Sequence, residues 1–234
     1  MLILIIGSAP DALEAQSLRR ELFGAIVAIN NAWKIRNDWD FCIFPDDFPE
    51  NRRPTKYKGQ HLVSSEQYVP IQNEYGGFVY SGGTMSFTAG YWALGHFKPK
   101  AIAYIGCDMI YDGKDTHFYG IGKPDPLRKD PTLKNLKAKS ARLEAIAASQ
   151  SCSVFNLSKR PSSNLVFRRS SLRNIIKEST PRRVNRNLLN RALQQEEKLG
   201  YFIENGQYWK HLAKFDQEKI DVLDELWNSI IQLD

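Results

Sequence analysis

Short apolar runs separated by turn residues recur along the first two thirds of the chain. The runs are continuous and do not alternate with polar residues, which is the pattern of strands buried on both faces of a parallel sheet. We expect strands at Leu2–Ile6, Ala25–Ile29, Phe41–Phe44, His61–Val63, Phe78–Tyr80, Ala101–Ile105 and Val154–Leu157.

Helical patterns lie between these runs. Residues 10–23 begin with a proline at a first-turn position and end at Gly24, as helices do. Residues 84–96 are apolar around most of the circumference of a helix, and residues 133–149 carry an apolar face. Alternation of strand and helix predicts an α/β fold over residues 1–160, with a doubly wound, mainly parallel, Rossmann-like sheet that binds a nucleotide.

The pattern changes after this point, and residues 161–234 read as a basic arm and a small, mostly helical appendage. We expect a helix over residues 181–198. Asn205-Gly206, which lies between two short apolar segments, predicts a hairpin because both central residues of that turn need positive φ. Asp216 should cap a last helix. The expected appendage is therefore helix–hairpin–helix.

Composition excludes several classes of protein. Of the 234 residues, 42% are hydrophobic and 12% aromatic, enough for a substantial core and too many for a largely disordered chain. No apolar run approaches the roughly 20 residues that cross a bilayer, and the opening run lacks the basic flank of a signal peptide. Cys42, Cys107 and Cys152 are far apart, so we expect reduced thiols in a cytoplasmic protein.

The net charge of +6 is concentrated in one segment. Residues 159–191 hold ten Lys or Arg and one acid, whereas residues 192–234 carry a net charge of −5. One interpretation of the basic segment is a solvated face that covers the core. Another is a surface that binds an anionic membrane, which would place the protein peripherally on the inner face of that membrane. Phe167 is the only aromatic residue in 159–191, which argues against nucleic acid as a partner.

The stripe of Ile220, Leu223, Trp227 and Ile230 on the last expected helix has two interpretations. It fits the core of the appendage, since such spacing marks one buried face of a helix. It also fits a contact between copies of the chain in a homo-oligomer.

Polar and small residues follow several of the expected strands. In open α/β sheets, ligands bind where strands end and helices begin, because free backbone N–H groups there donate hydrogen bonds to phosphate. Amide side chains at such positions can both donate and accept. The candidates are Gly7, Ser8, Ala9 and Pro10, then Asn30 and Asn31, then Ser81, Gly82, Gly83 and Thr84, and finally Gly106, Cys107, Asp108 and Tyr111. Each loop alone also reads as an ordinary turn or cap, but four at one sheet edge predict a ligand site.

A long polar loop at residues 112–128 follows the last of these groups. It carries His117, the side chain suited to proton transfer near neutral pH. It also supplies Lys123 and Arg128, which are natural partners for phosphate. Cys107 has no histidine at a fixed spacing to activate it as a nucleophile, and the acids form no metal-ligand pattern, so we expect no metal site.

The order of the segments "IIGSAPDA", "AINNAW", "DFCIF", "YSGGTMSFTAGYWALGH", "IAYIGCDMIY" and "AKSARLEAIAASQSCSVFNLS" resembles that of the bacterial sialyltransferases of glycosyltransferase family 42. It is also similar to a wider Rossmann-like set that includes archaeal-type pterin pyrophosphokinase-like domains. The resemblance covers roughly residues 1–158. It implies a nucleotide-binding sheet with a smaller lid, and metal-independent transfer of sialic acid from CMP-sialic acid to a sugar hydroxyl. Its site residues fall on Gly7, Ser8, Pro10, Asn31, Ser81, Gly82, Gly106, Asp108 and Tyr111.

The sequence departs from that family at several positions. Ser8 stands where the family usually has Asn, and Phe78 stands near the place of an Arg. Lys134 lies near the place of the catalytic His, and the nearest histidine, His117, is well upstream. The donor sugar, the base and the proton acceptor therefore stay open.

Three functions compete at this point. The first is a glycosyltransferase-like enzyme that transfers a sugar from a nucleotide donor to a hydroxyl of a glycan. CMP-sialic acid is one candidate donor. The transfer would invert the anomeric centre and would need no metal or other cofactor. Asn31 would contact the nucleoside, Asp108 and Tyr111 would line the donor, and His117 would act as the base. The second is Mg²⁺-dependent diphosphate transfer to a pterin-like alcohol. The third is a non-catalytic protein that binds a nucleotide or another anion.

Overall fold

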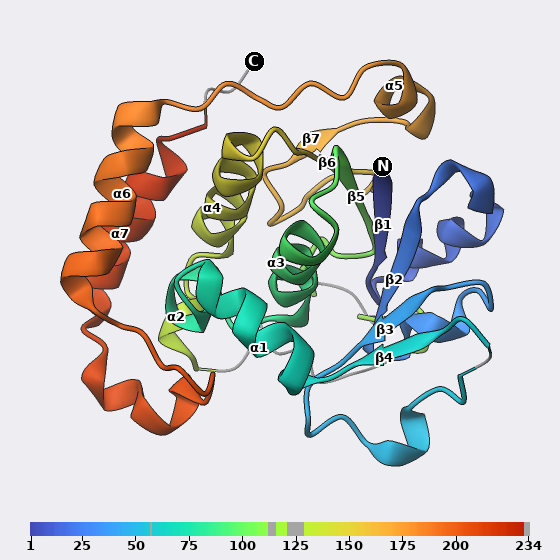
Figure 1. Ribbon diagram of the computed structural model, residues 1–234, viewed down its shortest axis with the longest axis horizontal. Helices are drawn as coiled ribbons and strands as arrows, with labels where there is room; N and C mark the ends of the chain where they lie inside the picture. Colours follow the sequence, from blue (N-terminus) through green and yellow to red (C-terminus); the bar gives the residue numbers. More distant parts are fainter. Residues whose placement is uncertain (57, 112–115, 121–128, 232–234) are drawn as a thin grey trace.

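The computed structural model describes residues 1–56, 58–111, 116–120 and 129–231. Its centre is a seven-stranded sheet in the order β4-β3-β2-β1-β5-β6-β7, and every neighbouring pair is parallel (Figure 1). The strands are β1 (Leu2–Ile6), β2 (Ala25–Ile29), β3 (Phe41–Ile43), β4 (His61–Val63), β5 (Ala101–Ile105), β6 (Ser153–Asn156) and β7 (Arg168–Arg169). Helices flank the sheet, and this confirms the expected doubly wound, Rossmann-like α/β fold.

The central strand is β1. Its Ile5 pairs with Val27 of β2 on one side and with Tyr104 of β5 on the other. The chain moves outward from β1 to β4, returns to place β5 beside β1, and then moves outward the other way. A reversal of this kind leaves a crevice beyond the carboxyl ends of the two central strands, where such sheets bind ligands.

Helices cover both faces of the sheet. One face packs against α1 (Ser65–Glu74), α2 (Phe78–Ser81) and α3 (Met85–Phe97), and the other against the 3-10 helix η1 (Pro10–Ser17) and the short helix α5 (Leu172–Lys177). Because side chains alternate along a strand, Ile3 and Ile5 belong to the first core and Leu4 and Ile6 to the second. All four side chains are fully buried, which explains the continuous apolar runs in the sequence.

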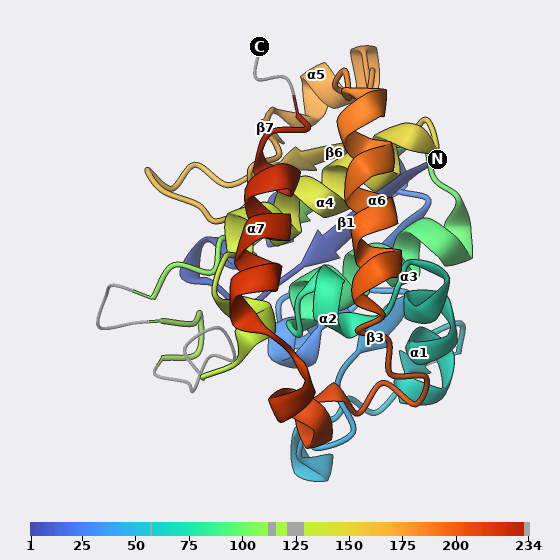
Figure 2. The ribbon, with the colours of Figure 1, turned by 90° about the vertical axis from the view of Figure 1, so that its left-hand side faces the viewer.

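Two C-terminal helices form a further layer. Helices α6 (Arg186–Leu199) and α7 (Gln217–Asn228) pack against α4 (Leu136–Ser149), which lies between them and the sheet (Figure 2). Trp227 of α7 is fully buried, as are Ile220, Leu223 and Ile230. The apolar stripe of the last helix is therefore part of the core and is not available to contact another copy of the chain, while the homo-oligomer itself stays a prediction.

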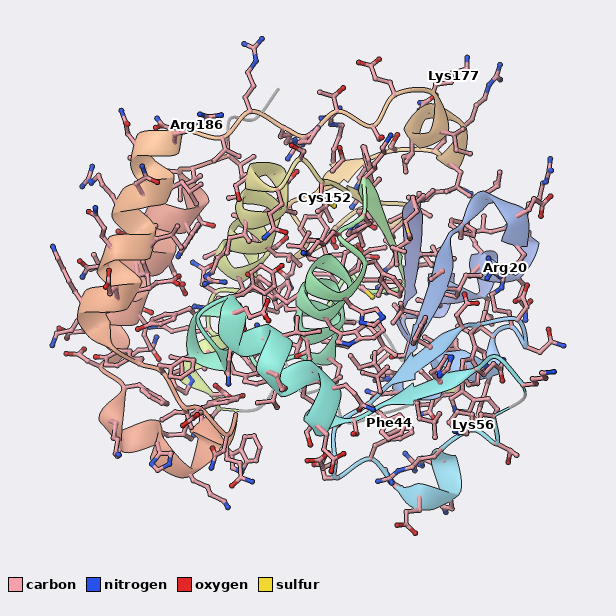
Figure 3. All side chains as sticks on the ribbon, viewed as in Figure 1. Arg20, Phe44, Lys56, Cys152, Lys177 and Arg186 are labelled. Atoms are coloured by element: carbon pink, nitrogen blue, oxygen red, sulfur yellow. The ribbon has the colours of Figure 1, made fainter. Side chains whose placement is uncertain are left out.

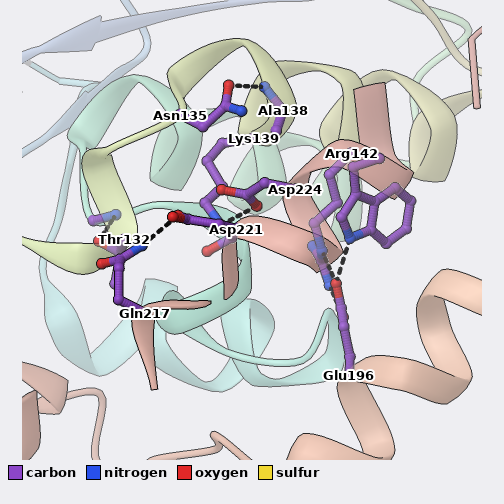
Figure 4. Close-up of polar contacts among 12 residues, drawn as sticks. Thr132, Asn135, Ala138, Lys139, Arg142, Glu196, Gln217, Asp221 and Asp224 are labelled. Carbon is purple, nitrogen blue, oxygen red and sulfur yellow. Dashed lines mark hydrogen bonds and ion pairs between the residues drawn. The ribbon is translucent and has the colours of Figure 1, made fainter. Parts of the chain in front are cut away.

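Because α4 is covered on both sides, its charged side chains need buried partners. Lys139 Nζ donates to Asp224 Oδ1 at 2.7 Å. Arg142 donates from Nε and Nη2 to the two carboxylate oxygens of Glu196, both at 2.7 Å, and Trp227 Nε1 donates to the same carboxylate at 2.9 Å (Figure 4). These contacts join α4 to both C-terminal helices.

Several elements differ from the sequence-based expectation. Residues 78–81 form the short helix α2, bracketed by two glycines at positive φ, Gly77 and Gly82. A fully buried apolar run of this length does not distinguish a strand from a helix. The first helical segment is η1 followed by a second 3-10 helix, η2 (Arg20–Leu22).

The C-terminal expectations were partly wrong. The helix expected over residues 181–198 is α6, and it begins only at Arg186. The Asn185 side chain caps it there by accepting from the N–H groups of Asn187 and Leu188. No described residue near Asn205 belongs to a strand. There the 3-10 helix η7 (Tyr208–Lys214) replaces the second half of the expected hairpin. Asp216 does cap α7, as expected.

Other features agree with the composition. No helix within the described residues has the length and apolar character needed to cross a bilayer. Cys42, Cys107 and Cys152 are all buried and unpaired, as expected for reduced thiols.

Candidate functional site

A cavity of about 850 Å³ lies at the carboxyl edge of the sheet. Its walls are the loops that follow β1, β2, β3 and β5, together with the N-terminus of α3. The described lining residues are Gly7, Ser8, Ala9, Ile29, Asn30, Asn31, Lys34, Pro45, Asp47, Phe48, Pro49, Arg52, Thr84, Met85, Ser86, Gly106, Cys107, Met109, Tyr111, His117 and Tyr119. The volume falls in the range of pockets that hold small-molecule ligands and cofactors.

Two glycines set the floor of this cavity. The backbone N–H of Ala9 donates to the carbonyl of Gly106 at 2.9 Å, so the loops after β1 and β5 touch. A Cβ on Gly7 would lie 2.2 Å from the Gly106 carbonyl oxygen, and one on Gly106 would lie 2.4 Å from Ala12 Cβ. Gly106 also has a φ of +70°, which disfavours other residues. Both glycines are needed for the close approach of the two loops.

Two asparagines begin the 3-10 helix η3 (Asn30–Lys34) directly after β2. Asn31 is only 5% exposed. The side-chain carbonyl oxygens of Asn30 and Asn31 are out of contact with solvent and accept no hydrogen bond from any described residue. A buried acceptor left unpaired costs about 1–3 kcal/mol. Both asparagines line the cavity, so their amide groups are candidates to bind amino or hydroxyl groups of a ligand.

Positive electrostatic features face the same cavity. Lys34, at the end of η3, and Arg52, in the 3-10 helix η4 (Glu50–Arg52), both line it. The N-terminus of α3 lies there too, where Thr84 caps the helix by accepting from the N–H of Phe87. A helix N-terminus and two cations favour an anion, although Asp47 adds one opposing charge.

The sequence did not single out Lys34 and Arg52. Lys34 lies one helical turn after the asparagines, in the motif Asn-Asn-Ala-Trp-Lys, and this spacing could have indicated it. Arg52 follows β3 at a distance that carries no such signal. The two cations that the sequence did suggest, Lys123 and Arg128, lie outside the described residues.

His117 lines the cavity and is only 7% exposed. Its Nδ1 lies 2.8 Å from the Thr116 hydroxyl, and its ring stacks on Tyr119 with centroids 4.9 Å apart. Burial lowers the pKa of His117 below its usual value, so the ring is neutral at pH 7. When Thr116 accepts from Nδ1–H, Nε2 is left as the proton acceptor.

The backbone fixes His117 relative to the first loop. The N–H of Phe118 donates to the Ser8 carbonyl at 2.9 Å, and His117 and Gly120 exchange backbone hydrogen bonds at 3.0 and 2.9 Å. Tyr111 also lies beside His117, with its ring centroid 6.1 Å from that of the histidine. The structure thus brings His117 and Tyr111 to the same cavity as Gly7, Ser8 and Asn31.

Asp108 occupies a different place from the one expected. Its side chain is fully buried and does not line the cavity. Oδ1 accepts from Asn156 Nδ2 at 2.8 Å, and the backbone carbonyl accepts from the Asn164 N–H at 2.9 Å. Asn164 also donates to the carbonyl of Met109, whose φ is +54°. Asp108 therefore supports the loop from behind and does not reach a ligand in the cavity.

Cys107 lines the cavity, but burial raises the pKa of its thiol far above the usual range. The side chain stays protonated at neutral pH and is a poor nucleophile. This agrees with the sequence, which supplied no partner to activate it.

The remaining candidates divide into those near the cavity and those away from it. Pro10, Ser81, Gly82 and Gly83 are not among its lining residues. Ser81 is buried, and the N–H of Gly83 donates to the Thr132 hydroxyl at 3.1 Å, in the 3-10 helix η6 (Pro131–Leu133). This turn positions α3 and contacts η6.

Lys134, the residue near the expected place of a catalytic histidine, does not line the cavity and forms an ion pair with Asp221 of α7. Within the described part of the chain, no group of three or more His, Cys, Asp and Glu side chains could hold a metal ion.

Comparisons with known proteins add no assignment: no family model, no curated protein and no solved structure matches this chain.

Proposed function

We propose that the protein is a glycosyltransferase-like enzyme that transfers a sugar from a nucleotide donor to a hydroxyl of a glycan. One observation carries the proposal. Asn30 and Asn31 line one cavity, and their side-chain carbonyl oxygens accept no hydrogen bond from the described residues. The same cavity holds two cations and a histidine that is kept neutral.

The donor would bind along the loops after β1 and β2. Asn30 and Asn31 would accept hydrogen bonds from the amino group of a base or the hydroxyls of a ribose. Lys34, Arg52 and the N-terminus of α3 would neutralise the phosphate. CMP-sialic acid fits this charge pattern, because its single phosphate and its carboxylate both carry negative charge.

The reaction needs one base. Neutral His117 would take the proton from the acceptor hydroxyl while that oxygen forms a bond to the anomeric carbon of the donor. The bond between the anomeric carbon and the phosphate oxygen breaks in the same step, and the nucleotide leaves with the electron pair. Attack opposite the leaving group inverts the anomeric centre. Tyr111 would lie beside the reacting groups, whereas Asp108 would hold the loop.

Thermal denaturation with candidate ligands tests the proposal, because a ligand that binds only the native state raises the melting temperature. CMP, CMP-sialic acid, UDP-sugars, GDP-sugars and ATP would each be added with and without Mg²⁺. A shift with CMP or a nucleotide sugar supports the proposal. A shift that requires both ATP and Mg²⁺ contradicts it in favour of diphosphate transfer. No shift with any nucleotide also contradicts it.

A further inference from the structure

The basic segment of the chain contains cations of two kinds. Arg168 and Arg182 point inward and fix the segment to the sheet. The Arg168 guanidinium lies 5.7 Å above the Phe155 ring and donates to the Thr180 carbonyl. Arg182 donates to the Val166 carbonyl at 2.9 Å and pairs with Glu144 at 3.4 Å. Positive charge at these two positions is thus explained by structure.

Four other cations point outward. We call Arg173, Lys177, Arg183 and Arg186 the basic edge. All four are exposed, and within the described residues none of them forms an ion pair. They lie on the β7 side of the molecule, from α5 along the connecting segment to the start of α6 (Figure 1). Figure 3 shows Lys177 and Arg186 near the two ends of this edge.

Protection of the sheet edge does not account for these cations. Charged residues on an edge strand prevent it from pairing with another chain. Here β7 is only two residues long, and both are arginines. The basic edge lies beyond β7 in the sequence, and the only acid of residues 159–191, Glu178, reduces its charge by one. The positive charge of the basic edge is therefore explained neither by contacts within the fold nor by protection of the sheet edge.

An apolar side chain is exposed among these cations. In α5, Ile175 is buried, but the next residue, Ile176, is 54% exposed. Ile176 lies between Arg173 and Lys177 in the sequence. At a lipid interface, cations meet anionic headgroups and an apolar side chain can enter the boundary layer, so an exposed aliphatic residue flanked by cations fits such a surface.

We propose that the basic edge binds the surface of an anionic phospholipid bilayer, with Ile176 entering the headgroup region. Nucleic acid fits less well, because Phe167, the only aromatic residue of 159–191, is 3% exposed and offers no ring for base stacking. The acidic stretch after residue 191 would turn α7 away from the same surface. This proposal goes beyond the proposed function and does not depend on it.

The test measures co-sedimentation of the full chain with vesicles of neutral phosphatidylcholine, with and without phosphatidylglycerol. We expect binding only to the anionic vesicles, and weaker binding as salt rises. The variant Arg173→Glu/Lys177→Glu should bind at least about 25-fold less tightly, from about fivefold for each cation lost. Ile176→Ser, which changes no charge, should also weaken binding.

A matched control changes charge elsewhere. Lys210→Glu/Lys214→Glu makes the same change in η7, which lies at the opposite end of the molecule in Figures 1 and 2. It should bind vesicles like the wild type. Unchanged circular dichroism and melting temperature would show that each variant is folded. Equal losses in both double variants would overturn the proposal, as would a lack of binding to anionic vesicles at low salt.

A second experiment distinguishes an anionic bilayer from nucleic acid as the partner of the basic edge. Duplex and single-stranded oligonucleotides would be titrated under the same salt conditions. Tight binding of an oligonucleotide, lost in Arg173→Glu/Lys177→Glu, together with no vesicle binding would assign the edge to nucleic acid and overturn the proposal. Vesicle binding that oligonucleotides do not displace would support it.

Discussion

At the scale of single residues, the cavity combines side chains that the sequence indicated with others that it did not. Gly7, Ser8 and Asn31 follow strand ends, and the parallel sheet brings strand ends together, so their placement was predictable. The orientation of Asp108 was not, because a loop aspartate can face either a ligand or the backbone behind it. Arg52 was missed because only tertiary structure brings η4 to the cavity.

The buried amide of Asn31 leads to a direct prediction. In Asn31→Ala, the affinity for the nucleotide should fall at least about tenfold, because the ligand loses a buried hydrogen bond. Isothermal titration calorimetry would measure the change. Asn37→Ala removes an exposed amide from the same loop region and should leave the affinity unchanged. Equal affinities for wild type and Asn31→Ala would remove this residue from the site.

The lowered pKa of His117 gives a second prediction, through the pH dependence of the rate. The ring must be neutral to act as a base, so the midpoint of the acid fall in kcat/KM should lie below the pH of about 6.5 at which an unperturbed histidine titrates. His117→Ala should lower kcat by about 10²–10⁴-fold and abolish this acid limb. An acid limb that persists in the variant would show that another group is the base.

At the scale of elements, the local sequence pattern predicted most strands correctly. It failed where tertiary packing determines whether a segment is a strand or a helix. The strands β1, β2 and β5 are continuous apolar runs of five residues and were predicted with their observed bounds. The run at 78–81 is equally apolar, but flanking glycines at positive φ turn it into a helix. The helix at residues 65–74 was not predicted, because Pro70 lies inside it and argues against a helix. Ser64 and Gln67 form a capping box that could have indicated where this helix begins.

The packing of α3 on β5 depends on one glycine. A Cβ at Gly90 would lie 2.0 Å from the Tyr104 hydroxyl oxygen. Gly90→Ala should therefore lower the free energy of unfolding by about 1–3 kcal/mol. Tyr104→Phe removes that oxygen and should restore part of the loss in the double variant. Urea denaturation measures both effects.

A control glycine tests backbone strain alone. Gly200 ends α6 at a φ of +63°, and a Cβ added there would have no atom within 4 Å. Gly200→Ala should cost about 1–2 kcal/mol from strain, and Tyr104→Phe should not relieve it. Relief of both variants by Tyr104→Phe would contradict the steric explanation.

At the scale of the whole molecule, the C-terminal segment is joined to the rest of the chain at two places. Arg168 and Arg169 form β7, the last strand of the sheet, and buried ion pairs join α4 to α6 and α7. The proposed division near residue 160 stays a prediction. Composition and charge indicated it, but neither reveals that the chain re-enters the sheet or that Arg142 is buried.

Removal of one charge from these pairs should destabilise the protein as a whole. Arg142→Met leaves Glu196 buried without its partner, and the free energy of unfolding should fall by about 3–5 kcal/mol. Trp227 contacts the same pair, so its fluorescence reports on the docking of α7 in a variant that keeps Trp227 and carries Phe at the other four tryptophan positions. We expect fluorescence and far-ultraviolet circular dichroism to change at the same urea concentration. Separate transitions would instead show that residues 161–234 unfold independently.

The central position of β1 has a consequence for synthesis of the chain on the ribosome. β1 emerges well before its partner β5, which begins at Ala101. Translation adds roughly 5–20 residues per second, so the edge of β1 that pairs with β5 stays unpaired for about 5–20 seconds. Nascent chains are exposed to aggregation during that interval. Conditions that slow elongation before residue 101 should therefore lower the yield of folded protein more than slowing it afterwards.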